Sequence, residues 1–430
     1  MNIKTCFFLL LLSLLITSCG EDRTIEYKER IEANSWIYRT MADEYLYASL
    51  LAKESSTTQY AEPAFYASSL FSAQENRHGQ KLSTFFWGRQ AEELDYGLLY
   101  NFHTHDTIRY LRVLHVFPFS SAAEAGLQRG DWITAIDGVP LSSANSTILA
   151  NTENALSRSL QLSEYVDTLK AGVPLLRPYR TVMLPAPRVR IPTAIEKDTV
   201  FNASERKIGY MLFTNLETSA TGGEDFYGAD AIRLRSIFRS FSQQDVNEIV
   251  LDLRFAYGQS LAIPYLTAAM LAPNEAIGQP FYYAVRNSNR ETELSLLSAS
   301  LIGEGARVPL ERLYVLTSAR TQGTAELLAH CLSPYMQVTL IGEKTAGQDQ
   351  LAEIYHNAAY DYSLRLVTTI FFNAAEETYS SGLLPAIALS ETNRLVWPMY
   401  PLGDPREALL KEALRCIHQT PADKPGISIP

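Results

Sequence analysis

Apolar residues recur at the spacings of strands and helices through the C-terminal half of the chain. An apolar run at Leu313–Thr317 leads into a turn, then into apolar residues at helical spacing from Leu327 to Leu332, and then into a second apolar run at Gln337–Ile341. This order predicts a strand, a tight turn, a helix and a second strand, the α/β crossover that often presents a nucleophile at the start of its helix. The positions at which such a unit would carry reactive groups hold Gly323 and Gln348.

The same alternation extends to both sides of this unit. Apolar strands are predicted at residues 208–213 and 248–253, and helices at residues 229–241 and 260–272. Strands that alternate with helices predict a mostly parallel sheet. A last helix is predicted to start at Asp404-Pro405-Arg406-Glu407, with Asp404 as its N-cap. Residues 193–430 are therefore expected to form a mixed α/β core.

Two smaller regions are predicted ahead of this core, so the fold class is α/β with several domains. Residues 20–88 carry apolar residues at helical spacing over 31–53 and again over 65–71, which predicts an N-terminal helical region. Residues 89–192 instead contain short β runs, such as the alternating run at 110–116. Prolines 174, 178, 185, 187 and 192 favour extended chain, which predicts a return strand followed by a linker.

The pieces that follow residue 116 stand in a specific order. A short helix within Ser120–Asp131 is capped by Gly126, and a strand at 132–136 ends in the turn Asp137-Gly138. This order resembles a PDZ domain of the bacterial periplasmic-protease type. The β region at 89–192 is therefore interpreted as a PDZ-like β domain.

PDZ domains of this type capture an extended peptide tail by strand addition, and backbone N–H groups of a short loop hold the carboxylate of the tail. The resemblance implies that this loop is Tyr96-Gly97-Leu98-Leu99, in which Gly97 lets the backbone approach closely. The alternative is that Gly97 is only a turn glycine. On the first interpretation the partners are peptides or unfolded protein C-termini.

The first residues of the chain have the features of a targeting signal. Lys4 precedes an apolar stretch, Phe7–Ile16, that is too short for a comfortable transmembrane helix. The segment Ile16-Thr17-Ser18-Cys19 resembles a bacterial lipobox, which implies a lipoprotein signal over residues 1–19 and lipidation of Cys19. The expected location is the cell envelope, lipid-anchored at the outer membrane and facing either the periplasm or the cell surface. A plain secretory signal or a short membrane anchor are the alternatives.

Composition narrows the possible partners and cofactors. The net charge of −10 argues against a general nucleic-acid binder, because phosphate contacts need clustered lysine and arginine. Cys331 and Cys416 lie on apolar helix faces, which favours two buried thiols over a disulfide, although export would permit a disulfide. His103 and His105 share one strand face, but no third ligand has convincing spacing, so no metal and no cofactor are expected.

Three stretches of the chain, residues 252–260, 317–326 and 341–348, together resemble the C-terminal processing peptidase family, also called the tail-specific proteases. Residues 371–385 and 401–405 add further matches, and the chain looks most like the lipoprotein members found in Bacteroidota. The resemblance implies a Ser–Lys dyad. In that dyad a buried lysine of lowered pKa takes the proton from a serine at a helix N-terminus, and backbone N–H groups hold the oxyanion.

The two residues of that dyad are replaced in this chain. The family pattern T-A-S-A-S-E aligns with residues 321–326 and places Gly323 at the nucleophile position. The pattern G-E-x-T-x-G-K aligns with residues 342–348 and places Gln348 at the lysine position. Glycine has no side chain that could attack a carbonyl, and a glutamine amide cannot accept a proton near neutral pH.

The oxyanion segment also departs from the family. The pattern D-L-R-x-N-G-G-G begins here with Asp252 and Arg254, which are expected to form a structural ion pair, and keeps only Gly258 of its glycines. The side chains of Tyr257 and Gln259 stand where glycines are expected, so we predict that they crowd the position of a scissile carbonyl.

Three hypotheses follow for the function. The favoured one is a pseudopeptidase that binds peptides or protein C-termini through its PDZ domain and core groove. The alternative is a working serine-type peptidase with a rearranged catalytic set, for which Thr324, Ser318 and Lys344 are the available substitutes. A purely structural lipoprotein is the third, and it would leave the PDZ loop without a ligand.

Overall fold

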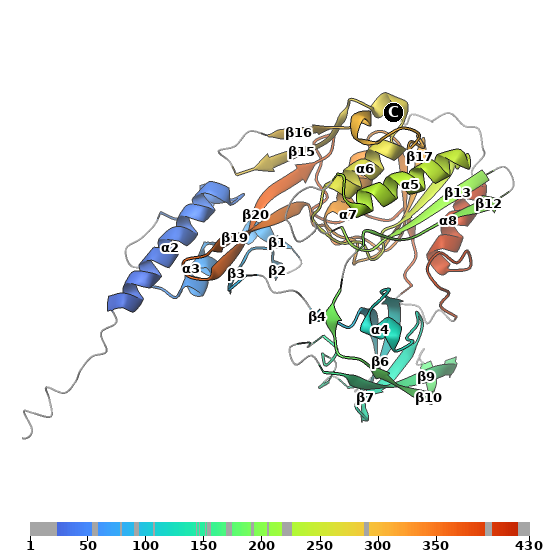
Figure 1. Ribbon diagram of the computed structural model, residues 1–430, viewed down its shortest axis with the longest axis horizontal. Helices are drawn as coiled ribbons and strands as arrows, with labels where there is room; N and C mark the ends of the chain where they lie inside the picture. The colour runs from blue at the N-terminus through green and yellow to red at the C-terminus, as the bar shows by residue number, and fades with distance from the viewer. Residues whose placement is uncertain are drawn as a thin grey trace, which may run out of the picture. The chain divides into compact units, whose positions relative to one another are not determined.

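The structure is a computed structural model (Figure 1). It forms two compact units: unit 1 comprises residues 1–89, 286–289 and 352–368, and unit 2 comprises residues 90–285, 290–351 and 369–430. The residues that the structure describes are 24–53, 59–77, 80–89, 94–105, 108–142, 144–145, 147–150, 152, 156–168, 174–190, 193–203, 206–216, 226–287, 292–391 and 398–419. The signal-like segment and Cys19 therefore lie outside the described residues.

Unit 1 contains the two helices predicted at the N-terminus. Helix α2 spans Thr24–Glu44 and helix α3 spans Pro63–Leu70. The first helix starts before residue 31 and ends well before residue 53, because tertiary contacts redirect the chain after Glu44. The ring of Tyr45 is fully buried, and the N–H of Leu46 donates to the carbonyl of Val367 at 2.8 Å.

Unit 1 also contains β-structure that the helical spacing did not predict. Strand β3, Thr84–Trp87, pairs antiparallel with Tyr362–Arg365 of the much later strand β20. The remaining elements associated with this region are η1 (Ala48–Leu50), η2 (Ala73–Glu75), β1 (Asn76–Arg77), β2 (Gln80–Lys81), and β19 (Gln350–Asn357) and β20 (Tyr362–Phe372), both of which continue from one unit into the other.

The PDZ region of unit 2 is an antiparallel sheet with a short helix against it. Its strands follow the order β10-β9-β7-β6-β5, and β8 pairs with β7. Asp137 and Gly138 both have positive φ (52° and 76°), as a tight hairpin turn between β7 and β8 requires. The elements are β5 (Leu98–His105), β6 (Ile108–Val116), α4 (Ser121–Glu124), β7 (Trp132–Ile136), β8 (Val139–Pro140), β9 (Arg158–Thr168) and β10 (Pro174–Leu184).

The core of unit 2 is the mostly parallel sheet that the alternation of strands and helices predicts. Its order is β12-β13-β14-β17-β18-β21, in which every pair except β12 with β13 is parallel. The antiparallel edge strand β12 was not predicted. The strands are β12 (Ile195–Ala203), β13 (Arg206–Phe213), β14 (Glu248–Asp252), β17 (Arg312–Thr317), β18 (Gln337–Gly342) and β21 (Ile387–Ala388).

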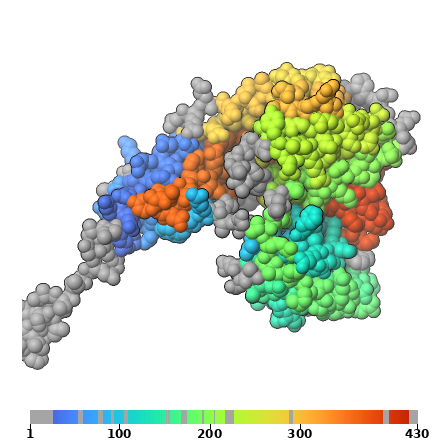
Figure 2. Space-filling model, in the orientation of Figure 1, coloured from blue at the N-terminus to red at the C-terminus, as the bar shows by residue number. Residues whose placement is uncertain are grey.

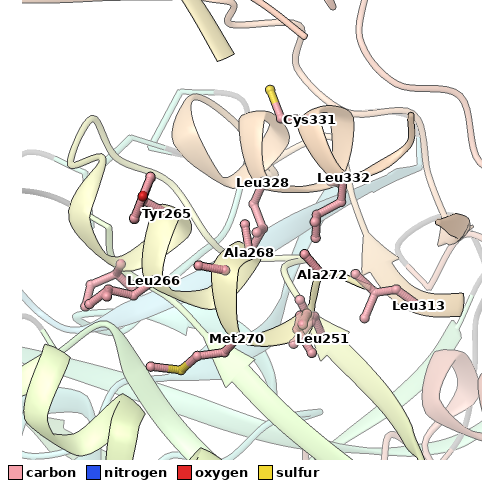
Figure 3. Packing of buried hydrophobic residues seen from close by; sticks show 14 of the residues in the cluster. Leu251, Tyr265, Leu266, Ala268, Met270, Ala272, Leu313, Leu328, Cys331 and Leu332 are labelled. Atoms are coloured by element: carbon pink, nitrogen blue, oxygen red, sulfur yellow. The ribbon is translucent and has the colours of Figure 1, made fainter. Parts of the chain in front are cut away.

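Helices cover both faces of this sheet. Because side chains alternate along a strand, Ile249 and Leu251 of β14 pack with α5, α6 and α7, whereas Val250 packs with α8. Figure 3 shows the first of these layers, where Leu251 and Leu313 lie below Leu328 and Leu332. The helices are α5 (Ala229–Gln243), α6 (Ala262–Leu271), α7 (Thr324–Leu332) and α8 (Ala408–Gln419); the remaining elements are β4 (Leu94–Asp95), β11 (Arg188–Val189), η4 (Asn274–Ala276), β15 (Pro280–Arg286), β16 (Glu293–Leu296) and η5 (Ala299–Leu301).

The last helix starts later than its sequence signal. Helix α8 begins at Ala408, and the carboxylate of Glu407 accepts a hydrogen bond from the N–H of Leu410 at 3.0 Å, so Glu407 takes the capping role predicted for Asp404. Asp404 instead binds the side chain and the N–H of Arg406. The red residues in Figure 2 show that the outer side of α8 is at the surface of unit 2. In the described part of the chain, no helix combines the length and apolar character needed to cross a bilayer.

Candidate functional site

The turn between β17 and α7 has the geometry of a nucleophile elbow. Gly323 is the N-cap residue of α7, with φ of 67° and ψ of −128°. This backbone conformation is strained for any residue with a side chain, and elbows that present a nucleophile at a helix start are sharp and strained in the same way. The strand, turn and helix predicted from residue 313 onward are confirmed.

The structure brings together Gly323 and Gln348, the positions at which the family resemblance implies a nucleophile and a lysine. A Cβ atom added at Gly323 would lie 3.8 Å from Nε2 of Gln348. Both residues line a small hollow of about 170 Å³, whose other lining residues are Gly258, Gln259, Thr324, Gln350, Leu351, Phe371 and Tyr379. None of these nine residues is a lysine, a histidine or a carboxylate, so the lining of the hollow contains no side chain suited to act as general base near neutral pH.

The loop at Gly258 fills the place where a nucleophile would stand. A Cβ atom added at Gly323 would lie 2.3 Å from the carbonyl oxygen of Gly258, which is far inside van der Waals contact. The same oxygen accepts hydrogen bonds from the N–H of Thr324 at 3.1 Å and from its hydroxyl at 3.3 Å. In an elbow, the N–H of the residue after the nucleophile belongs to the oxyanion hole. Here that donor is already bonded within the chain.

Glu326 holds the elbow and the Gln348 loop in one arrangement. Its carboxylate is fully buried and accepts hydrogen bonds from the N–H groups of Gly323 at 3.1 Å, Gly347 at 2.6 Å and Gln348 at 2.8 Å, and from the hydroxyl of Thr345. Burial raises the pKa of Glu326 to about 7, and these four hydrogen bonds act in the opposite direction. The carboxyl group therefore joins α7 to the loop that carries the former lysine position.

Only one of the three possible substitutes reaches the hollow. Ser318 is buried, and its hydroxyl donates to the carbonyl of Arg254 and accepts from the N–H of Arg320, so it stabilises the turn. Lys344 is exposed and does not line the hollow. Thr324 does line it, but its hydroxyl donates to the carbonyl of Gly258.

The two bulky residues of the oxyanion segment behave differently. Gln259 lines the hollow, as predicted. The prediction for Tyr257 was wrong, because Tyr257 does not line the hollow and instead contacts Arg190 in the linker that follows the PDZ region. The hydroxyl of Tyr257 accepts hydrogen bonds from Arg190 at 3.1 Å and Asn215 at 3.2 Å.

The predicted peptide loop of the PDZ region has a constrained backbone. Gly97 has φ of 75°, and a Cβ atom added there would lie 2.0 Å from the Cβ of Ser120. Glycine is therefore required at this position by the close approach to Ser120 as well as by the turn. Its N–H donates to the carboxylate of Asp95. Tyr96 and Leu98 bury their side chains in the PDZ core, and Leu99 lies in the edge strand β5. The carbonyl of Tyr96 accepts from the N–H of Ala122 at 2.8 Å, and that of Gly97 accepts from the N–H of Phe117 at 3.0 Å.

The expected ion pair of Asp252 and Arg254 is part of a larger buried network. The guanidinium of Arg254 contacts Asp252 at 2.9 Å and both Glu391 and Glu407 at 2.8 Å. Arg129 of the PDZ region joins the same carboxylates, contacting Glu407 at 3.4 Å and Glu391 more closely. The sequence did not single out Arg129 or Glu391, since no local pattern connects residues so far apart in the chain. The network ties the PDZ region to the core within unit 2.

The remaining candidates have ordinary roles. Cys331 and Cys416 are both free thiols, and burial raises the pKa of the Cys331 thiol. His103 lies against the ring of Trp132 at 5.0 Å, and burial lowers its pKa. The side chain of His105 lies outside the part of the chain that the structure describes.

Comparison with known proteins finds family matches for two parts of the chain. The profile of peptidase family S41 matches residues 207–388, and the profile of the PDZ domain matches residues 112–150. One similar solved structure comes from Bacteroides fragilis and is assigned to the S41 proteases. It is 28% identical to this chain, the match covers 89% of this chain and 97% of the other, and the TM-score is 0.76. The photosystem II D1 C-terminal processing protease is 14% identical, the match covers 84% of this chain and 93% of the other, and the TM-score is 0.49. Residues 207–388 of this chain therefore match peptidase family S41, and residues 112–150 match the PDZ domain.

Proposed function

We propose that this protein is a pseudopeptidase of the tail-specific family that captures peptides or protein C-termini. The observation that carries the proposal is the hydrogen bond from the N–H of Thr324 to the carbonyl of Gly258, beside a nucleophile position occupied by Gly323. The site lacks the attacking group and the base, and the donor that would hold an oxyanion is already bonded. A working peptidase with Thr324 as its nucleophile remains the competing function. It would have to break the hydrogen bond between the N–H of Thr324 and the carbonyl of Gly258, and it would have to recruit a base from outside the hollow.

Peptide capture is assigned to the PDZ region rather than to the core hollow. Pockets that enclose small ligands usually measure about 300–1,000 Å³, whereas the hollow has almost no enclosed space that even a water molecule could occupy. Strand β5 is the edge strand of the PDZ sheet, and it follows directly from the Gly97 loop. An edge strand next to a glycine loop is the arrangement that PDZ domains use to add a peptide as a further strand.

Replacing Gly97 with alanine is expected to weaken peptide binding by about tenfold, because the added Cβ displaces the loop from Ser120. The matched control is Gly126→Ala. Gly126 also has positive φ, 71°, but a Cβ atom added there meets open space. The measurement is fluorescence anisotropy with a labelled pool of decapeptides whose last three residues are randomised. Equal affinity of the two variants would remove the loop from the binding site, and no binding by the native protein would leave only a structural role.

We also propose that Cys19 anchors the protein in the cell envelope through a lipid, with the family likeness to lipoprotein members as support. In cells grown with a clickable fatty-acid analogue, the native protein is expected to become labelled and the Cys19→Ala variant is expected to lose the label completely. The Cys6→Ala variant, which changes the other cysteine of the signal-like segment, should keep it. Labelling that persists in Cys19→Ala would show that the lipid assignment is incorrect.

A further inference from the structure

The free edge of the PDZ sheet can be located residue by residue. Tyr100 of β5 stands opposite Val113 of β6. The N–H of Val113 donates to the carbonyl of Asp131 at 2.9 Å, and its carbonyl accepts from the N–H of Gly130 at 2.8 Å. Val113 therefore directs its N–H and C=O groups away from β5. In an antiparallel pair, the opposite residue then directs its own N–H and C=O to the outer side, so Tyr100 presents its backbone at the free edge.

Arg320 occupies this edge. Its Nη2 donates to the carbonyl of Tyr100 at 2.9 Å and to Oδ1 of Asn101 at 3.1 Å. Arg320 comes from the turn between β17 and α7, where its own N–H donates to the hydroxyl of Ser318 at 3.0 Å. The elbow turn of the core thus supplies a donor to the PDZ strand on which a peptide would add.

We propose that Arg320 is a latch that competes with peptide for the edge of the PDZ domain, an inference that rests on the proposed function. An added strand bonds to the edge backbone groups in alternation, so it needs the carbonyl of Tyr100 that Arg320 already uses. Peptide binding therefore releases the guanidinium. Bound peptide weakens the contact between Arg320 and Tyr100 by some factor. By reciprocity, that contact weakens peptide binding by the same factor.

The latch acts locally because other contacts hold the PDZ region on the core. Arg129 lies in the buried carboxylate network with Glu391 and Glu407, and Arg190 joins Asp95 at 3.2 Å to the hydroxyl of Tyr257 at 3.1 Å. Neither arginine contacts Tyr100 in the described contacts. Release of Arg320 therefore leaves these contacts in place while it frees the turn that leads to Gly323.

The test compares Arg320→Ala with the native protein in the anisotropy assay, with the pool of labelled decapeptides carrying a free C-terminal carboxylate. Loss of one competing hydrogen bond predicts about fivefold tighter binding. Arg180→Ala is the matched control: Arg180 is an exposed PDZ arginine that also donates to a backbone carbonyl, that of Gly126 at 3.2 Å, and it lies on β10 at the opposite edge of the sheet. The affinity of Arg180→Ala for the peptide pool should equal that of the native protein.

The possible outcomes separate the latch from the proposed function. Tighter binding by Arg320→Ala alone supports the latch. Unchanged affinity of Arg320→Ala overturns the latch and leaves peptide capture intact, and weaker binding overturns it too, because Arg320 would then contact the peptide itself. Absence of binding by both the native protein and Arg320→Ala means that peptide capture fails, and the latch fails with it.

Discussion

Replacing Arg254 with leucine is expected to lower the free energy of unfolding by about 3–5 kcal/mol, the usual cost of removing one partner from a buried ion pair. Arg254 is fully buried and contacts the carboxylates of Asp252, Glu391 and Glu407. Leucine would leave three buried carboxylates, of which Glu391 and Glu407 would still contact Arg129. Urea unfolding followed by circular dichroism measures the change.

Arg177→Leu provides the control, since Arg177 pairs with Glu164 where both side chains are largely exposed (71% and 43%). Its expected effect is within about 1 kcal/mol. An Arg254→Leu effect of that size would show that the buried network contributes no more than a surface pair.

Acid should reduce the difference between Arg254→Leu and the native protein. Burial favours the neutral form of Glu407, but the charge and hydrogen bonds of Arg254 outweigh burial and lower its pKa from 4.5 to about 2. The stabilisation from ionised Glu407 is therefore present above pH 4.5 and is lost as the pH falls toward 2. In the variant the carboxylate has lost this partner, so the difference in unfolding free energy should shrink across that range.

Restoring the family dyad by Gly323→Ser and Gln348→Lys is expected to yield no cleavage of an unfolded protein substrate. The serine Cβ would lie 2.3 Å from the carbonyl oxygen of Gly258, and a φ of 67° costs a residue with a side chain about 1–3 kcal/mol. The Gly258 loop must move before the hydroxyl can stand at its position. We therefore expect a destabilised protein that remains inactive, with both properties measured on the purified ectodomain.

Activity should appear only when the oxyanion segment is restored as well. A variant that adds Ala256→Asn, Tyr257→Gly and Gln259→Gly to the two dyad changes reproduces the family pattern and gives the loop the freedom to withdraw its carbonyl from Thr324. Its control carries the three loop changes without the dyad. Cleavage by the native protein that is lost in Thr324→Ala would instead favour the rearranged enzyme. Cleavage by the double variant would show that the loop does not block the site.

The glycine at position 323 and the conformation of the Gly258 loop are sterically compatible with each other. Glycine at 323 tolerates the positive φ of the elbow without strain, and the space that a serine side chain would take holds the carbonyl of Gly258. Glu326 meanwhile keeps the elbow and the Gln348 loop together. The elbow is therefore held by hydrogen bonds from backbone N–H groups to the Glu326 carboxylate, and these bonds do not depend on a nucleophile.

Local patterns were sufficient for the core elements because each depends on residues close in sequence. The apolar run at 248–253 and the helical spacing after Gly323 correspond to β14 and α7. The same reasoning failed where a distant partner decides the outcome. Helix α2 ends at Glu44 because Leu46 bonds to Val367, and α8 starts after Glu407 because that carboxylate caps the helix and also pairs with Arg254.

The sequence alone places glycine and glutamine at the positions where the family resemblance implies a nucleophile and a base, and neither side chain can serve in that role whatever its surroundings. Only the tertiary structure decided how the rest of the site is used. It brings the carbonyl of Gly258 to the N–H of Thr324, turns Tyr257 toward Arg190, and places Arg320 on the edge of the PDZ sheet. These contacts join residues that are tens to hundreds of positions apart, and their geometry depends on how the whole chain packs, which no local pattern of residues encodes.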